Sequence, residues 1–586
     1  WDELVEFERT EIGLSGARKI EAVMTNHPWL ETVQSVAADQ GFFHWDLDFA
    51  AVFARGGFDL QVGNPPWVRP DVKMDDLYAE LDPWFALAQK PTQAVKNERR
   101  ERLNTNARIR ELVHSGVSES VATAAVLGSI PDYPHLKDQR PDLYRGFIGR
   151  TWANASNVGV ISLIHPESHF TEVGAVQLRR GAYLRLRRHW HFINEFKLFD
   201  VDNNTIYGVH IYGCSVEEPL FLQATNLYHP RTVIESLAHS GQGPLPGIKD
   251  DDGNWDVRPH RDRVEEVNRE TLQLWHSVLA EESVDPLSSR IVYTVTREAT
   301  TVLQRMMSSR RVRQLGLNFS TGWNETTSRQ NGYFETKWTN PQKWSEVILQ
   351  GPHIGVSAPM VKVPNKTMKN SKDWTFVDFE AVQTDFIPTT TYEVNLSERR
   401  KFDRDFTTWS VGDRLVKATS QVRFAWREYI GGTTGARSLQ GALIPPGATH
   451  VNSVNALWGP SNEHVVVGVI SSSIVADFLI RSVVGGHVYR AVLNTLPVPK
   501  NSWLLKEATE RYLRLNCLTE AYAPLWEEVM GEAWDVDTPL RKDEERRAAQ
   551  VEIDAIVALS LSVTADELCM IYRTQFPVMR RYDQED

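Results

Sequence analysis

Cysteine is scarce in this 586-residue sequence, which contains only three. Cys214, Cys517 and Cys569 lie far apart and form no Cys-x-x-Cys pair. Closely spaced cysteines are what structural zinc sites and disulfide frameworks need. The sequence therefore predicts neither of these, no bound metal, and a reducing environment.

Long apolar runs are missing as well. No run of ~18 apolar residues occurs, so no membrane-spanning helix is expected. The first residues, Trp1-Asp2-Glu3-Leu4, lack the basic and apolar regions of a secretory signal. We therefore expect a cytoplasmic protein that contacts no membrane. Because an initiator Met is also missing, we expect the chain to be a piece of a longer protein.

Positive charge is in deficit, with 64 Lys and Arg against 76 Asp and Glu, for a net charge of -12. This deficit does not exclude DNA, because phosphate contacts depend on where cations cluster rather than on their sum. One cluster lies within residues 96–110 and another within residues 179–189. The candidate DNA contacts of the second cluster are Arg179, Arg180, Arg187 and Arg188. A solvated helix face is the alternative for either cluster.

The first part of the chain has the pattern of an α/β domain. Apolar runs alternate with helical stretches over residues 1–240, as in a parallel sheet covered by helices. Strands are predicted at residues 58–63, 158–164 and 207–212. A helical insertion is expected at residues 75–130, and its alanine-rich residues 121–126 should face the core.

The rest of the chain divides into three predicted parts. These are a helical linker over residues 241–309, a mixed α+β domain over 310–500, and a helical region over 501–586. A helix of ~20 residues is expected from about Arg261. Residues 465–470 are typical of a strand, and Thr564 begins a capping box.

The most informative feature is the turn Asn64-Pro65-Pro66-Trp67, which directly follows the first predicted strand. The side-chain oxygen of Asn64 and the carbonyl of Pro65 can both accept hydrogen bonds from one exocyclic amine. Pro66 fixes φ and removes a competing N–H, and Trp67 can stack on a flipped base. The alternative is a turn that merely closes the strand, with the aromatic ring in the core.

Other polar and aromatic groups follow predicted strands. In doubly wound sheets ligands bind beyond the carboxyl ends of the strands. His165-Pro166-Glu167-Ser168 follows the second strand, and Phe199 ends an apolar stretch over residues 193–199. We expect these groups to line one crevice together with Asn64.

An ordered set of segments resembles the gamma-class adenine-N6 DNA methyltransferases, in the branch of large bacterial restriction-modification and phage-defence enzymes. The catalytic part of the resemblance rests on residues 42–49, 57–67, 142–147, 159–166, 193–199 and 209–212. Residues 437–447 and 493–499 look like the target-recognition domain that these enzymes carry.

The resemblance implies a Rossmann-like sheet, S-adenosylmethionine as cofactor, double-stranded DNA as substrate, and base flipping. It assigns Asn64 and Pro65 to gripping the adenine N6 amine. Trp67 and Phe199 would stack on the extruded base. Asp48, with Phe49 beside it, matches a carboxylate that accepts a hydrogen bond from the cofactor's adenine amine, with a solvated Asp as the alternative.

The second domain contains candidate readout residues. Arg423, Arg427 and Arg437 lie in a stretch rich in aromatics and glycines. Arginine can contact guanine in two places through the major groove, whereas phosphate contact or surface solvation is the alternative.

One feature of the family is missing. The glycine-rich turn that cradles the cofactor should lie upstream of Asn64, yet residues 1–40 contain only Gly13-Leu14-Ser15-Gly16. We therefore expect the first strands of the sheet to be absent. A missing N-terminal segment or another subunit of a defence system would supply them.

Two further functions are alternatives. Pro141-Asp142 with Glu195-Phe196-Lys197 spells a nuclease pattern that can hold a divalent cation, although both pieces also fit the methyltransferase resemblance. A DNA-recognition subunit without catalysis would bind its sequence whether or not the cofactor is present.

Overall fold

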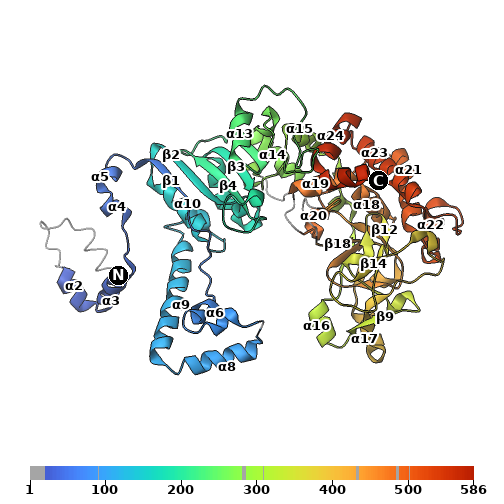
Figure 1. Cartoon of the computed structure of the whole chain (residues 1–586), viewed down its shortest axis with the longest axis horizontal. Coiled ribbons are helices and arrows are strands. Elements are labelled where there is room, and N and C mark those ends of the chain that lie inside the picture. The colour runs from blue at the N-terminus through green and yellow to red at the C-terminus, as the bar shows by residue number, and fades with distance from the viewer. Residues whose placement is uncertain are drawn as a thin grey trace.

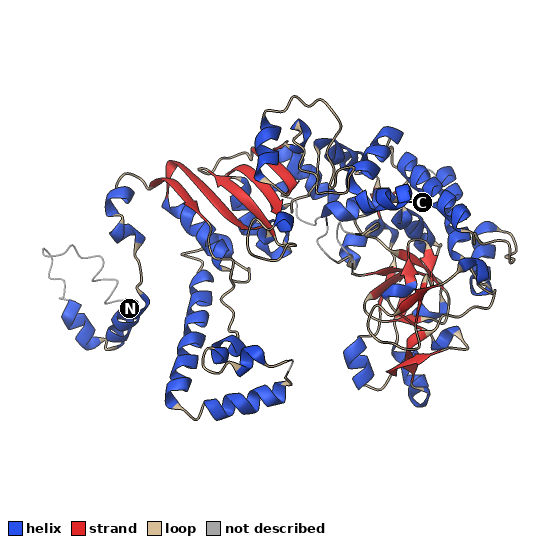
Figure 2. Cartoon of the chain, viewed as in Figure 1, coloured by secondary structure: helices blue, strands red, loops and turns tan. Residues whose placement is uncertain are grey.

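The computed structural model describes residues 20–89, 91–279, 285–307, 309–429, 435–483, 487–500 and 502–585. The chain forms two lobes that lie side by side (Figure 1). One large sheet belongs to the first lobe, and smaller sheets with C-terminal helices above them form the second (Figure 2). The Gly13-Leu14-Ser15-Gly16 segment lies outside the described residues.

The large sheet is mixed rather than parallel, with the strand order β1-β2-β4-β3-β5-β6. Its strands are β1 (Phe58–Gly63), β2 (Ala155–Pro166), β3 (Leu186–Ile193), β4 (Ile206–Tyr212), β5 (Phe221–Leu227) and β6 (Glu265–Val267). The β1–β2 and β3–β5 pairs are parallel, and the other pairs are antiparallel. The prediction of a parallel sheet is confirmed in part, because β1, β2, β3 and β5 run in one direction and β4 and β6 run against them.

The three predicted strands are confirmed as β1, β2 and β4. The second basic cluster, within residues 179–189, does not lie on one continuous helix face. Helix α12 (Val176–Tyr183) carries its first arginines, and β3 carries its last ones. The cluster is therefore divided between a helix and a strand.

Strand β1 is an exposed edge rather than a buried strand. Leu60 is 63% exposed and Val62 is 73% exposed, and Val158 on β2 is exposed too. Among the described residues, no strand pairs with the outer side of β1. Apolar side chains on a strand normally lie on a covered face. This edge is where the missing strands would belong, which stays a prediction.

Two apolar clusters cover the two faces of the sheet. Ile161 and Leu163 pack in the cluster that includes Ile148 of α10 (Leu143–Asn154) and Leu178 of α12. The helix α11 (Ser168–Thr171) lies on this side. Trp190, Tyr207 and Val233 of α13 (Pro230–Leu237) belong to the cluster on the other face.

Helices precede and follow β1. Those before it are α2 (Ile20–Asn26), α3 (Trp29–Gln40), α4 (Trp45–Asp48) and α5 (Ala50–Phe53). Those after it are α6 (Met74–Ala79), α7 (Trp84–Leu87), α8 (Gln93–Leu103) and α9 (Ala107–Leu127). The long α9 extends away from the sheet (Figure 1). Val121 and Val126 on it are 57% and 55% exposed, so the prediction that residues 121–126 face the core is wrong.

The connection between the lobes is less helical than predicted. Instead of one helix of ~20 residues, the chain from Arg261 forms a 3-10 turn (Arg261–Arg263), strand β6 and the ten-residue α14 (Arg269–Val278). The reason is that residues of β6 pair with the edge strand β5. Helix α15 (Arg297–Met306) then leads into the second lobe.

The second lobe contains a four-stranded antiparallel sheet with the order β19-β18-β21-β8. These strands are β8 (Asn318–Thr321), β18 (Arg423–Arg427), β19 (Gly441–Ile444) and β21 (Val454–Trp458). The longer two-stranded pairs are β9 (Phe334–Thr339) with β15 (Thr390–Val394), β13 (Lys362–Pro364) with β14 (Trp374–Phe376), and β16 (Thr408–Val411) with β17 (Arg414–Lys417).

The strand predicted at residues 465–470 is wrong, because these residues lie in helix α18 (Glu463–Ser472). Nearly every side chain of α18 is buried, as in the following α19 (Ile474–Val483). A helix that is apolar all round shows no helical periodicity in its sequence. In the part of the chain that the structure describes, no single helix meets the length and hydropathy needed to cross a membrane, although the bent α18–α19 pair does.

The C-terminal residues are helical as predicted. Their helices are α21 (Ser502–Asn516), α22 (Ala523–Met530), α23 (Asp543–Ser560), α24 (Ala565–Gln575) and α25 (Pro577–Glu585). The capping box at Thr564 is confirmed, since its hydroxyl accepts from the Glu567 N–H and the Glu567 carboxylate accepts from the Thr564 N–H. One apolar core runs from Ile161 of the sheet to Phe576 of the C-terminal region.

Replacement of Gly57 by alanine should destabilise the pairing of β1 with β2. Gly57 has φ +111°, and a Cβ there would lie 2.6 Å from the Asn154 carbonyl oxygen. An L-residue in this conformation costs about 1–2 kcal/mol before the clash is counted, so amide hydrogen exchange across residues 58–63 should accelerate about tenfold or more.

Gly63→Ala is the matched control for this change. Its Cβ would meet only Leu163, at an ordinary 3.6 Å. Equal exchange rates in the two variants would contradict the close approach of Gly57 to β2.

Candidate active site

The Asn64-Pro65-Pro66-Trp67 turn lies beyond the carboxyl end of β1. Gly63 pairs with Leu163, so the turn runs beside the last residues of β2. Asn64 and Pro66 are exposed, whereas Pro65 is buried. The indole N–H of Trp67 donates to the Ile164 carbonyl at 3.3 Å. This bond fixes the turn to the neighbouring strand, while Asn64 stays exposed.

Three aromatic rings gather around the turn. The ring centroid of Trp67 lies 5.9 Å from that of Tyr207 and 6.0 Å from that of Phe199. Phe199 also meets Tyr207 edge to face at 5.0 Å. The structure therefore brings together the two aromatics that the sequence proposes and adds Tyr207. An aromatic within a strand is typical of a core position, so the sequence holds no signal for this third ring.

Asn194 holds Phe199 in place. Its side-chain oxygen accepts from the Phe199 N–H at 3.1 Å, and its amide donates to the Phe199 carbonyl at 2.9 Å. Burial raises the pKa of Tyr207 to about 12, so its ring stays neutral at physiological pH. The aromatic group is thus an uncharged, positioned surface beside an exposed amide.

A large cavity of about 1310 Å³ opens on the other side of Asn64. Its walls come from β1, α9, α10 and the segment before α4, and it includes Asn64, Pro65 and Pro66. Phe42, Phe43, Trp45 and Asp46 also line it. The cavity is larger than the 300–1,000 Å³ of most small-molecule sites.

The two proposed cofactor residues lie beside this cavity without lining it. The carboxylate of Asp48 accepts from the His44 N–H at 3.0 Å. Phe49 packs on Phe43 and Phe58. Asp46, two residues earlier, lines the cavity, as do the carboxylates of Asp39 and Glu119.

The four arginines of the first lobe that are proposed to contact DNA differ in how much of their side chains is exposed to solvent. Arg179 is 1% exposed and donates to the carbonyls of His169, Glu172 and Ser288. Arg187 and Arg188 donate to nearby backbone carbonyls but are only partly buried. Arg180 is exposed and pairs with Asp285 at 2.9 Å. Arg179 is therefore a structural residue, and Arg180, Arg187 and Arg188 retain exposed surface.

The readout candidates of the second lobe are mostly internal. Arg423 is fully buried and donates to the Ala448 carbonyl, and burial lowers its pKa to about 9. Arg427 donates to the Ile354 carbonyl at 2.6 Å, and burial lowers its pKa to about 10. Arg437 pairs with the buried Asp477 at 2.8 Å. These guanidiniums support the fold, and none of the three is presented as a free surface cation.

The nuclease pattern is not assembled as a metal-binding group. Asp142 accepts from Arg69 at 3.3 Å, and Glu195 accepts from Asn203 at 3.2 Å. Within the described ranges, the side chains whose ligand atoms converge for a metal are Glu167, His189 and His210 instead.

Comparison with protein families adds an independent finding. Residues 4–114 match the family described as Eco57I restriction-modification methylase. The chain is similar to a restriction-modification methylase. The matched segment contains β1 and the Asn64 turn, whereas Phe199 and Tyr207 lie outside it. No curated protein matches the sequence.

Solved structures of restriction-modification enzymes resemble the chain only distantly. The Type IIL enzyme MmeI in complex with DNA has 9% identity and a TM-score of 0.35, with 90% of this chain and 57% of that chain covered. The type IIG restriction endonuclease BpuSI has 14% identity and a TM-score of 0.27, with 85% and 54% covered. This chain thus spans about half the length of these two structures.

Arg179 and Arg180 should respond differently to substitution by methionine. Arg179→Met removes donors from three buried carbonyls, so it should lower the free energy of unfolding by about 2 kcal/mol or more. Arg180→Met removes one exposed ion pair and should cost less than about 1 kcal/mol. Urea unfolding measures both values.

A specific loss of DNA affinity in Arg179→Met, with the free energy of unfolding unchanged, would contradict the structural role given to Arg179.

Proposed function

We propose that this chain carries the base-gripping part of a DNA adenine-N6 methyltransferase that uses S-adenosylmethionine in a restriction-modification or phage-defence system. The observation that carries the proposal is the exposed amide of Asn64. Asn64 lines the large cavity, and Trp67 of the same turn belongs to the aromatic group, within the segment similar to restriction-modification methylases.

The amine is held by acceptors of this chain. The Asn64 side-chain oxygen and the Pro65 carbonyl accept from the two hydrogens of the adenine N6 amine. Hydrogen bonds of this kind favour the pyramidal nitrogen that attacks a methyl group, so orientation contributes more than a strong base. The methyl group would come from S-adenosylmethionine when it is bound, and this chain's acceptors would orient the amine nitrogen toward it.

The cavity wall offers aromatic surface and a hydrogen-bond acceptor that an adenine-containing cofactor can use. Phe42, Phe43 and Trp45 offer apolar ring surface, and the Asp46 carboxylate can accept from an exocyclic amine. Asp48 and Phe49 support this wall from behind. The chain supplies one wall of the site, and strands beside β1 would supply the rest.

The aromatic group suits an extruded base. Removal of a base from the duplex costs a few kcal/mol, and stacking on aromatic rings returns about 1–3 kcal/mol. Trp67, Phe199 and Tyr207 supply this surface, and Asn194 keeps Phe199 in position. Double-stranded DNA is thus the proposed substrate.

Asn64→Ala should abolish methyl transfer while leaving DNA affinity nearly unchanged, because it removes contacts to one amine and none to phosphate. The measurement is transfer of labelled methyl from S-adenosylmethionine to duplex DNA, with binding followed by gel shift. Asn340→Ala, an exposed asparagine of the second lobe, is the control. Near-normal transfer by Asn64→Ala would refute the proposal.

A DNA-recognition subunit without its own catalysis is the second candidate, and the unpaired apolar edge of β1 favours it. Gel shifts with and without S-adenosylmethionine separate the two. Sequence-specific binding that ignores the cofactor, with no methyl transfer, would favour the recognition subunit.

A further inference from the structure

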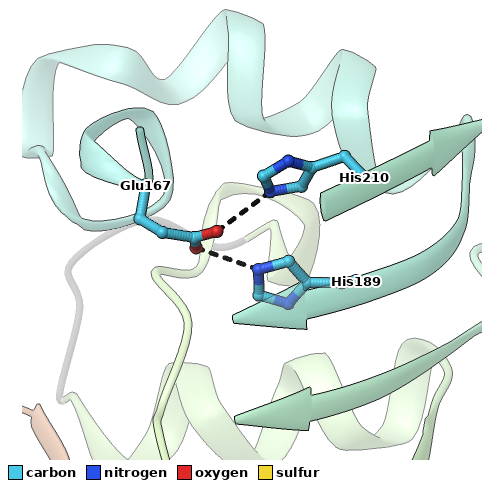
Figure 3. Close-up of side chains that lie close together, drawn as sticks. All are labelled: Glu167, His189 and His210. Atoms are coloured by element: carbon cyan, nitrogen blue, oxygen red, sulfur yellow. Dashed lines mark hydrogen bonds and ion pairs between the residues drawn. The ribbon is translucent and has the colours of Figure 1, made fainter. Parts of the chain in front are cut away.

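Three buried side chains, two on strands of the large sheet and one just after a third strand, lie close together (Figure 3). Glu167 directly follows β2, His189 lies on β3, and His210 lies on β4. His189 and His210 are register partners on neighbouring antiparallel strands, so their rings share one face. All three residues are at most 5% exposed.

The carboxylate meets both imidazoles. Glu167 Oε2 lies 2.9 Å from His189 Nε2, and Oε1 lies 3.0 Å from His210 Nε2. The ligand atoms of the three residues all lie within 4.8 Å of one another. Nitrogen and oxygen ligands bound at ~2.1 Å to one tetrahedral zinc ion are about 3.4 Å apart, so the two close pairs here would need to separate by about half an ångström to admit the ion.

The hydrogen-bond partners of His189 fix what lies between it and the carboxylate. Its Nδ1 lies 2.9 Å from the side-chain oxygen of Gln223 on β5, and an amide oxygen only accepts, so Nδ1 carries a hydrogen. Its Nε2 lies 2.9 Å from Glu167 Oε2. This second contact holds either a second proton on His189 or a metal ion between the two atoms.

The contact between Glu167 and His210 also requires a proton or a metal ion between its two atoms. Glu167 Oε1 and His210 Nε2 are close, yet among the described residues neither atom has a partner in hydrogen-bond geometry. Buried polar atoms without a hydrogen bond are rare and point to a missing proton or ion.

The surroundings are built to hold this carboxylate in one position. A Cβ at Gly208 would lie 2.0 Å from Glu167 Oε1, so only glycine leaves room there. The hydroxyl of Tyr293 donates to Glu167 Oε2 at 3.2 Å. Gln223 orients His189 in the way that outer partners orient metal-binding histidines.

We propose that Glu167, His189 and His210 bind one divalent transition-metal ion of the zinc class. Two imidazoles and a carboxylate are the ligands that such ions take in proteins. The ion would tie the end of β2 to β3 and β4. The site lies on the face of the sheet opposite the aromatic group of Trp67, because His189 and Trp190 alternate along β3. The ion is therefore structural and takes no part in the proposed methyl transfer.

The test measures metal content of the untagged protein after equilibration with zinc and removal of excess ion, by mass spectrometry of the elements. About one ion per chain is expected. His189→Gln and Glu167→Gln should each lower this content tenfold or more. His191→Gln is the matched control, since His191 lies two residues along β3, is also buried, and stands outside the group.

Cobalt binding keeps the test decisive if the variants fail to fold. The wild-type protein, freed of metal and given Co²⁺, should develop the visible absorption of a cobalt ion bound by nitrogen and oxygen ligands. No metal in the wild type after exposure to zinc and cobalt would overturn the proposal and leave a protonated histidine pair around Glu167. Equal metal content in Glu167→Gln and the wild type would overturn it too, because the ion would then lie elsewhere.

Discussion

The candidate site depends on the parallel pairing of β1 with β2. Among the described residues β1 pairs with no other strand, so this ladder holds the strand that leads into the Asn64 turn. Its register sets Gly63 against Leu163 and allows the Trp67 indole to reach the Ile164 carbonyl. At the other end, Gly57 permits a close approach that any side chain would prevent. The position of the amide relative to the aromatic rings follows from these contacts.

The same sheet positions two different groups on its two faces. On one face, Trp67 and Phe199 gather around Tyr207 of β4. On the other, His210 of the same strand meets Glu167. Tyr207 and His210 are three positions apart on β4, so strand alternation places them on opposite faces, and a change in the register of β4 would disrupt both groups. The antiparallel insertion of β4 between β2 and β3 is thus the feature of the topology that brings them together.

The local features could be predicted from the sequence, and the burial of charged groups could not. The strands β1, β2 and β4 are recognisable as apolar runs bounded by turn residues, and the turn at Asn64 is recognisable from its composition. Helix α18 is not, because a helix buried on all sides has no polar face to give it a period. The arginines show the same limit, since Arg179 and Arg180 are adjacent in sequence and only the packing of α12 decides which is buried. Glu167, His189 and His210 come together only through strand pairing, so their spacing along the chain carries no metal signature.

The central claim is that the Asn64 turn grips an adenine amine for methylation. The most direct measurement identifies the modified nucleoside by mass spectrometry after duplex DNA is incubated with the protein and S-adenosylmethionine, in its longer natural chain if it has one. We predict N6-methyladenine as the product. A methylated cytosine, or DNA that remains unmodified by a protein shown to bind both DNA and cofactor, would contradict the account.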